Sequence, residues 1–253
     1  MKVPKTAAVA SGLGVLVLGV VLFGLQDRIR ERWYLYQFRH GDPEAQRKAA
    51  QELGKVGSET SLMLLSEYGV RYLPELILRW GLPDLEQDGK SIRIRHPSEN
   101  EYSVVGEAFA AIPEIRKRIG LAASQAASMR YLEDPASDSR LRLWLAQLLL
   151  LALTPPEKLP PGLQPQGDFY LFRSLEPGTK EYRFFHERKS LAIAVCVEAL
   201  SSADQYARGG AVFALALWAG ESDEAVRALR SVTANPDPYV GKAAAEVLAQ
   251  LGK

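Results

Sequence analysis

Residues Asp42–Gly57 read DPEAQRKAAQELGKVG, and residues Asp237–Gly252, near the other end of the chain, read DPYVGKAAAEVLAQLG. At matched positions the two segments share an Asp-Pro pair, a basic residue, two alanines, two apolar residues and a glycine. A pattern that returns in this way indicates structural repeats, each of which stacks on its neighbours. The sequence therefore predicts related helical units near both ends of the chain.

The pattern has the features of a helix with its own start and stop signals. An aspartate side chain can accept hydrogen bonds from the free N–H groups of a first helical turn, and the proline after it suits the first helical position. In the first copy, Ala45, Ala49, Leu53 and Val56 follow at helical spacing on one face. The alanines let a neighbouring helix approach closely, and the last glycine favours the helix end.

Together these residues resemble the HEAT-repeat signature, a family in which paired antiparallel helices stack into a right-handed solenoid. The resemblance implies structural roles for Asp42 with Arg47 and for Asp237 with Lys242. A third, degenerate copy begins at Ala203, where alanine replaces the aspartate and Arg208 keeps the basic position. The expected fold is an all-α, HEAT-like α-solenoid of antiparallel helix pairs over residues 27–253.

An uncharged apolar segment, residues 6–26, precedes the repeats. A helix of this length rises about 30 Å, which matches the hydrocarbon core of a bilayer. A cleaved signal peptide is the alternative, but the segment is longer than the usual apolar core and lacks an A-x-A-like site. We therefore expect residues 1–26 to form a transmembrane signal anchor of a single-pass membrane protein. Basic residues flank both ends, so the side of the soluble domain is undetermined.

Small residues at spacing four within the anchor, Ala8 with Gly12 and Ala10 with Gly14, could support a weak homodimer.

The middle of the chain departs from the repeat pattern, with irregular insertions at about 83–100 and 154–186. Helices are expected over 104–128, with a break at Pro113, and over Leu141–Leu153. The second of these is apolar on nearly all sides but too short to span a bilayer, which predicts a central buried helix. One or two small β-hairpins are expected in the insertions.

The second insertion contains the candidate partner-binding residues. Residues 169–172 and 182–185 flank a Pro177-Gly178 turn and could pair as a hairpin. Aromatic residues and arginine concentrate binding energy at protein interfaces. In the alternative interpretation, the aromatic side chains fold down over the core. The candidates are Phe169, Tyr170, Phe172, Arg173, Tyr182, Arg183, Phe184 and Phe185.

Charge and motifs argue against several classes of function. The net charge of +1 gives no general field for nucleic acid, so no nucleic-acid partner is expected. Cys196 is the single cysteine and lies in an apolar run, which predicts a buried thiol. The three histidines are isolated, and no metal-binding, P-loop or nucleophile-elbow motif occurs. We therefore expect no metal, no cofactor and no catalytic residues.

The sequence thus predicts a non-catalytic, membrane-tethered scaffold or adaptor of the HEAT-repeat type for protein partners of unknown identity. The alternatives are a HEAT-like lyase or other enzyme with a site not visible in the sequence, and a purely structural spacer. If the aromatic insertion holds the partner, replacing Phe172 and Phe184 with serine should abolish capture.

Overall fold

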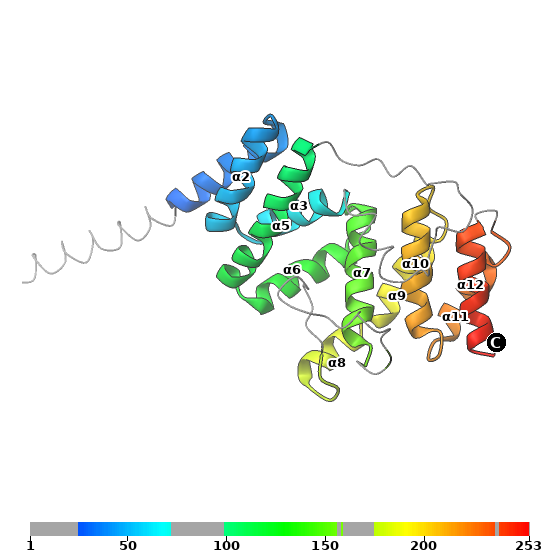
Figure 1. Cartoon of the computed structure of the whole chain (residues 1–253). Coiled ribbons are helices and arrows are strands. Elements are labelled where there is room, and N and C mark those ends of the chain that lie inside the picture. The colour runs from blue at the N-terminus through cyan, green and yellow to red at the C-terminus, as the bar shows by residue number, and fades with distance from the viewer. Residues whose placement is uncertain (1–24, 72–98, 156–157, 159–174, 236–237, 253) are drawn as a thin grey trace, which may run out of the picture.

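The structure is a computed structural model that describes residues 25–71, 99–155, 158, 175–235 and 238–252. These residues contain helices and no strand. The helices follow one another from α2 at one end of an elongated array to α12 at the other (Figure 1). After a helical segment at residues 25–40 come α2 (Pro43–Val56), α3 (Glu59–Arg71), α5 (Glu99–Ile119), α6 (Leu121–Glu133), α7 (Ser139–Leu153), α8 (Lys180–His186), α9 (Lys189–Ala199), α10 (Gln205–Trp218), α11 (Asp223–Val232) and α12 (Pro238–Gln250).

The first copy of the repeat pattern forms α2 as predicted. The Oδ1 atom of Asp42 accepts a hydrogen bond of 2.8 Å from the backbone N–H of Ala45, which caps the helix. Ala49, Ala50 and Leu53 are buried on one face. The degenerate third copy is also helical, since it forms α10.

Helix α2 packs on α5, to which α3 is also bound. The contact is close because the two helices meet at small residues. A Cβ atom added at Gly54 would lie only 3.3 Å from Cβ of Ala111 on α5. Helix α3 reaches α6 and α7 as well, so it joins the N-terminal helices to the centre of the array. The N-terminal copy is thus stabilised by a helix distant from it in the sequence.

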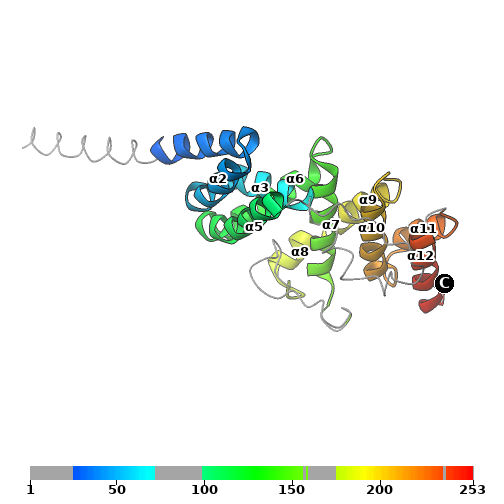
Figure 2. The same cartoon turned by 45° about the horizontal axis from the view of Figure 1, so that its top comes forward.

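Helix α7 is the central helix of the array, and nearly every residue from Leu141 to Leu153 is buried. This confirms the predicted buried helix. It begins after Asp138, whose carboxylate accepts hydrogen bonds from the N–H groups of Arg140 and Leu141. Helices α9 and α10 pack on α7, and α10 in turn contacts α11 and α12. Figure 2 shows this part of the array from a second direction.

The structure corrects the predicted hairpin at residues 182–185. These residues lie in α8, whose first turn is capped by Thr179: its hydroxyl oxygen accepts from the N–H of Tyr182 at 3.0 Å. Gly178, with φ of 89°, makes the turn before the cap, so the Pro-Gly signal precedes a helix and not a second strand. The other predicted strand, residues 169–172, and most of the first insertion lie outside the described residues.

The predicted break at Pro113 is also wrong. Helix α5 continues through Pro113 to Ile119. The chain breaks instead at Gly120, whose φ of 86° favours glycine, before α6 starts at Leu121. Proline removes one backbone donor, but packing on both α2 and α3 favours a continuous α5.

The predicted single-pass membrane localisation is corrected as well. Within the described ranges, no helix combines the length and the apolar content needed to cross a bilayer. Most of the predicted spanning segment, residues 6–26, lies outside the described residues, and only residues 25 and 26 fall within them. The lipid contact and the homodimer predicted through this segment have no support in the described part of the chain.

Candidate functional site

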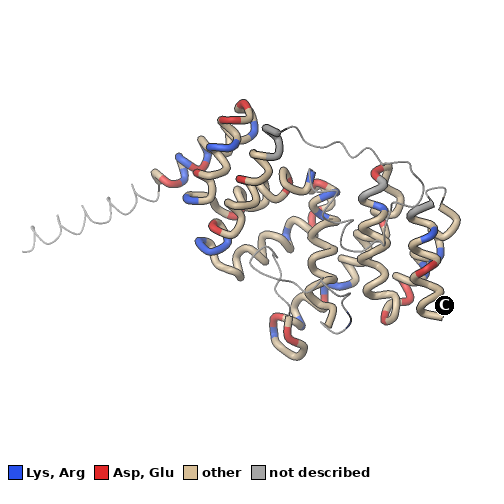
Figure 3. The backbone as a smooth tube through the Cα atoms, in the orientation of Figure 1, with Lys and Arg blue, Asp and Glu red and all other residues tan. Residues whose placement is uncertain are grey.

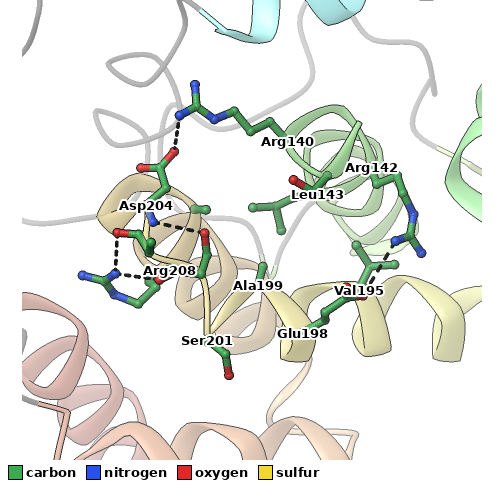
Figure 4. Close-up of a pocket in the computed structure, with 13 residues that line it drawn as sticks. Arg140, Arg142, Leu143, Val195, Glu198, Ala199, Ser201, Asp204 and Arg208 are labelled. Atoms are coloured by element: carbon green, nitrogen blue, oxygen red, sulfur yellow. Dashed lines mark hydrogen bonds and ion pairs between the residues drawn. The ribbon is translucent and has the colours of Figure 1, made fainter. Parts of the chain in front are cut away.

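A cleft of about 850 Å³ lies where the start of α7 faces the end of α9 and the start of α10 (Figure 4). The segments that form it come together because α9 and α10 both pack on α7. The residues that line the cleft are Ser139, Arg140, Arg142, Leu143, Val195, Glu198, Ala199, Ser201, Ser202, Ala203, Asp204, Ala207 and Arg208.

Two arginines of α7 reach across the cleft to acidic partners (Figure 4). A guanidinium nitrogen of Arg140 lies 3.0 Å from a carboxylate oxygen of Asp204, just before α10. Arg142 lies 3.7 Å from the carboxylate of Glu198 on α9. The Arg142 side chain is only 9% exposed, whereas that of Glu198 is 72% exposed. Arg142 Nε also donates to the backbone oxygen of Leu132 at 3.2 Å, which fixes its buried end.

The third arginine, Arg208, holds the loop between α9 and α10. One of its guanidinium nitrogens donates to the backbone oxygens of Ser202 at 2.7 Å and Ala203 at 3.1 Å. In the same loop, the hydroxyl of Ser202 accepts from the N–H of Asp204 at 3.1 Å. The basic position of the degenerate repeat copy therefore shapes one wall of the cleft.

The cleft has the chemistry of a recognition site. Its wall presents three guanidinium groups and two carboxylates beside the apolar side chains of Leu143 and Val195. A guanidinium group offers a planar fork of donors that matches a carboxylate. Arg140 and Asp204 are both partly exposed, so solvent can reach this pair.

The predicted partner-binding residues on α8 differ in their exposure to solvent. On α8, Phe185 is buried at 2% exposure and Tyr182 packs against the core, as in the alternative interpretation. Phe184 is 43% exposed, and the guanidinium of Arg188 lies 3.7 Å from the centre of its ring. Arg183 is also exposed. Phe169, Tyr170, Phe172 and Arg173 lie outside the described residues.

The predicted structural residues of the repeat also differ in their contacts. Asp42 caps α2. Arg47 is exposed on α2. Lys242 lies 3.9 Å from Glu246 on its own helix, α12, so this contact does not join two helices. Asp237 lies outside the described residues.

Sequence reasoning missed most of the cleft residues. The one available signal was RLRLWL at the start of α7, where Arg142 interrupts a face that is otherwise apolar. A basic side chain on a buried face needs a polar partner. The partners, Leu132 and Glu198, come from α6 and α9, so only the tertiary structure identifies them.

Cys196 of α9 is fully buried, as predicted, and burial raises the pKa of its thiol to about 12. Among the described residues, no group of three or more His, Cys, Asp or Glu side chains is arranged to hold a metal ion.

The C-terminal part of the chain is similar to a known family. Residues 193–253 match a family model described as HEAT repeats. The matched segment contains most of α9 and all of α10, α11 and α12. No curated protein matches the chain, and no solved structure matches it. The match supports a HEAT-repeat assignment, and HEAT repeats generally mediate protein–protein interaction.

Proposed function

We propose that this chain is a non-catalytic protein-binding scaffold, and that the cleft between α7, α9 and α10 receives an acidic segment of the partner. The observation that carries the proposal is the position of the cleft. Two of its three walls, the end of α9 and the start of α10, belong to the segment that matches HEAT repeats. Such repeats use extended surfaces formed by stacked helices to hold partners.

The arginines of the cleft favour an acidic partner. Arg140 is half exposed, and the carboxylate that it contacts, that of Asp204, is itself accessible to solvent. A surface ion pair of this kind contributes little to stability, on the order of 0–1 kcal/mol, so a partner carboxylate can replace Asp204 at small cost. Arg142 is held by Leu132 and stays in place during the exchange.

The size and lining of the cleft also fit a short peptide segment. A volume of about 850 Å³ can receive a few side chains. Leu143 and Val195 offer apolar contact next to the guanidinium groups. A partner segment with an acidic residue beside an apolar residue would contact both the guanidinium groups and the apolar side chains of the cleft.

The proposal can be tested with a photo-crosslinking amino acid placed in the full chain at Ala199, which lines the cleft. We expect defined protein adducts from this position and their loss when Arg140→Glu is added. A matched probe at exposed Gly220, after α10, should not give the same adducts. Arg227→Glu, an exposed charge reversal on α11, serves as the control variant and should leave the adducts unchanged.

Two outcomes would overturn the proposal. Identical adducts from Ala199 and Gly220 would show contact without a specific site. Absence of any protein adduct from Ala199 would favour the structural spacer.

A further inference from the structure

The helical segment at residues 25–40 carries an apolar stripe on its outer face. Leu25, Ile29, Trp33 and Tyr36 are 46%, 65%, 58% and 57% exposed. Their spacing of four, four and three residues places them in one row along the helix. Contiguous apolar side chains on a surface mark an interaction site, whereas single exposed residues do not. The stripe therefore requires an explanation.

The orientation of this helix is determined by its opposite face. Phe38 is buried, and Glu31 accepts hydrogen bonds of 2.6 Å from both the N–H of Ser58 and the hydroxyl of Ser61 at the start of α3. Gln46 of α2 donates to the backbone oxygen of Phe38 at 3.0 Å. These contacts hold the helix on α2 and α3 and keep the stripe facing outward.

A row of arginines runs along one edge of the stripe. Arg28, Arg32 and Arg39 are all exposed. At roughly 100° per residue, they lie about 60–100° from the centre of the stripe and on the same side of it. The two acidic residues of the helix have other positions: Asp27 lies 4.0 Å from Arg30, and Glu31 is bound to α3. Figure 3 shows the basic positions along this first described helix.

We propose that this surface, Leu25, Ile29, Trp33 and Tyr36 edged by Arg28, Arg32 and Arg39, binds an acidic amphipathic helix of a partner protein. The spacing of Ile29, Trp33 and Tyr36, four and then three, is that of a helix–helix seam, so a second helix can lie along it. The row of three arginines determines the charge expected of the partner helix. Acidic residues beside the apolar face of that helix would complement the arginines. Tryptophan, tyrosine and arginine are also the residue types most enriched among binding hot spots.

A second copy of the chain fits this surface less well. It would bring its own three arginines to the interface, where like charges oppose binding. The proposed surface is also separate from the cleft, since it lies on the helix that packs against α2 and α3 and not on α7, α9 or α10. The two sites can therefore be tested independently.

The test uses the full chain and a labelled helical peptide with leucine at the seam positions and glutamate at the flanking positions. A second peptide has lysine in place of every glutamate. We expect the glutamate peptide to bind, with an affinity that falls as salt is raised, and the lysine peptide to bind at least tenfold more weakly. Fluorescence anisotropy measures both.

Two variants locate the binding. Trp33→Ser and the double variant Arg32→Glu with Arg39→Glu should each weaken the glutamate peptide at least tenfold. A matched double variant on α11, Arg227→Glu with Arg230→Glu, should leave the affinity unchanged. Circular dichroism checks that each variant remains folded. Because Ile29 is the most exposed residue of the stripe, Ile29→Ser gives a second apolar variant with little risk to folding.

Three results would overturn the proposal. The first is equal binding of the glutamate and lysine peptides, or no binding of either. The second is self-association of the chain that Trp33→Ser abolishes, which would make a second copy the occupant. The third is binding to vesicles of anionic lipid that depends on the stripe, without binding of the glutamate peptide.

Discussion

The two clear copies of the repeat pattern form similar helices but pack differently. In α2, Ala49, Ala50 and Leu53 are all buried, and the helix rests on α5. In α12, Ala244 and Leu248 are buried, and the helix packs on α10 and α11, which directly precede it.

The family match also differs between the two copies. It covers the copy in α12 and not the copy in α2. A short motif can thus determine where a helix begins and which face it buries, but the rest of the fold determines which helix covers that face. Four predictions test this contrast.

The largest effect on stability is expected from truncating Leu53, the buried leucine of the repeat pattern in α2. Leu53→Ala removes a fully buried side chain between α2 and α5 and should lower the free energy of unfolding by about 2–5 kcal/mol. Leu248→Ala, at the matched position of α12, should cost less because Leu248 retains some exposure. Urea denaturation of the two variants measures both costs. Equal costs would mean that the two copies are equally well packed.

Replacing a glycine in each helix should have an intermediate effect on stability. Here the larger loss is expected in α12 and the smaller one in α2. A Cβ atom at Gly241 in α12 would lie 2.9 Å from the backbone oxygen of Thr233, which cannot move easily. Gly241→Ala should therefore destabilise the chain by about 1–3 kcal/mol. Gly54→Ala in α2 meets Ala111 at 3.3 Å, and the gain in helix propensity offsets part of the crowding. A larger loss for Gly54→Ala would contradict the account.

The aspartate and the basic residue of the repeat pattern should contribute unequally to the stability of the chain. Asp42→Ala removes the cap of α2 and should cost about 0.5–2 kcal/mol. Lys242→Ala removes an exposed pair at 3.9 Å within α12 and should change stability by less than about 0.5 kcal/mol. Thermal denaturation followed by circular dichroism distinguishes the two. A large loss for Lys242→Ala would indicate a contact between helices at this position.

The smallest effect concerns the thiol of Cys196, which reports only on the HEAT-matched segment because the chain has no other cysteine. Burial raises its pKa from 9.0 to about 12, so the thiol stays protonated in the folded chain at pH 9. The thiolate is the reactive form. Labelling of the native chain by a thiol reagent should thus change little between pH 7 and 9, whereas labelling of the unfolded chain should rise steeply. A similar rise in the native chain would show that α9 is loosely packed.

Sequence reasoning succeeded where local signals determine the structure. It predicted the cap and buried face of α2, the helix at the degenerate copy and the buried helix α7. It failed where tertiary context decided the outcome. The aromatic residues Tyr182 to Phe185 suited a strand, but the Thr179 cap and the packing of Phe185 favoured α8.

The cleft was missed for the same reason. Its arginines come from α7 and α10 and its acidic residues from α9 and the loop before α10, so no single stretch of sequence contains the site. The spacing of Leu25, Ile29, Trp33 and Tyr36 indicates one helical face, but the exposure of that face depends on Glu31 and Phe38, which hold the opposite face of the helix against the rest of the chain.

The most direct test of the scaffold account is hydrogen–deuterium exchange of the full chain, alone and bound to the protein that crosslinks at Ala199. The account predicts slower exchange at the start of α7, the end of α9 and the start of α10, and unchanged exchange in the contact between α2 and α5. Slower exchange confined to α2 and α5, with none around the cleft, would contradict it.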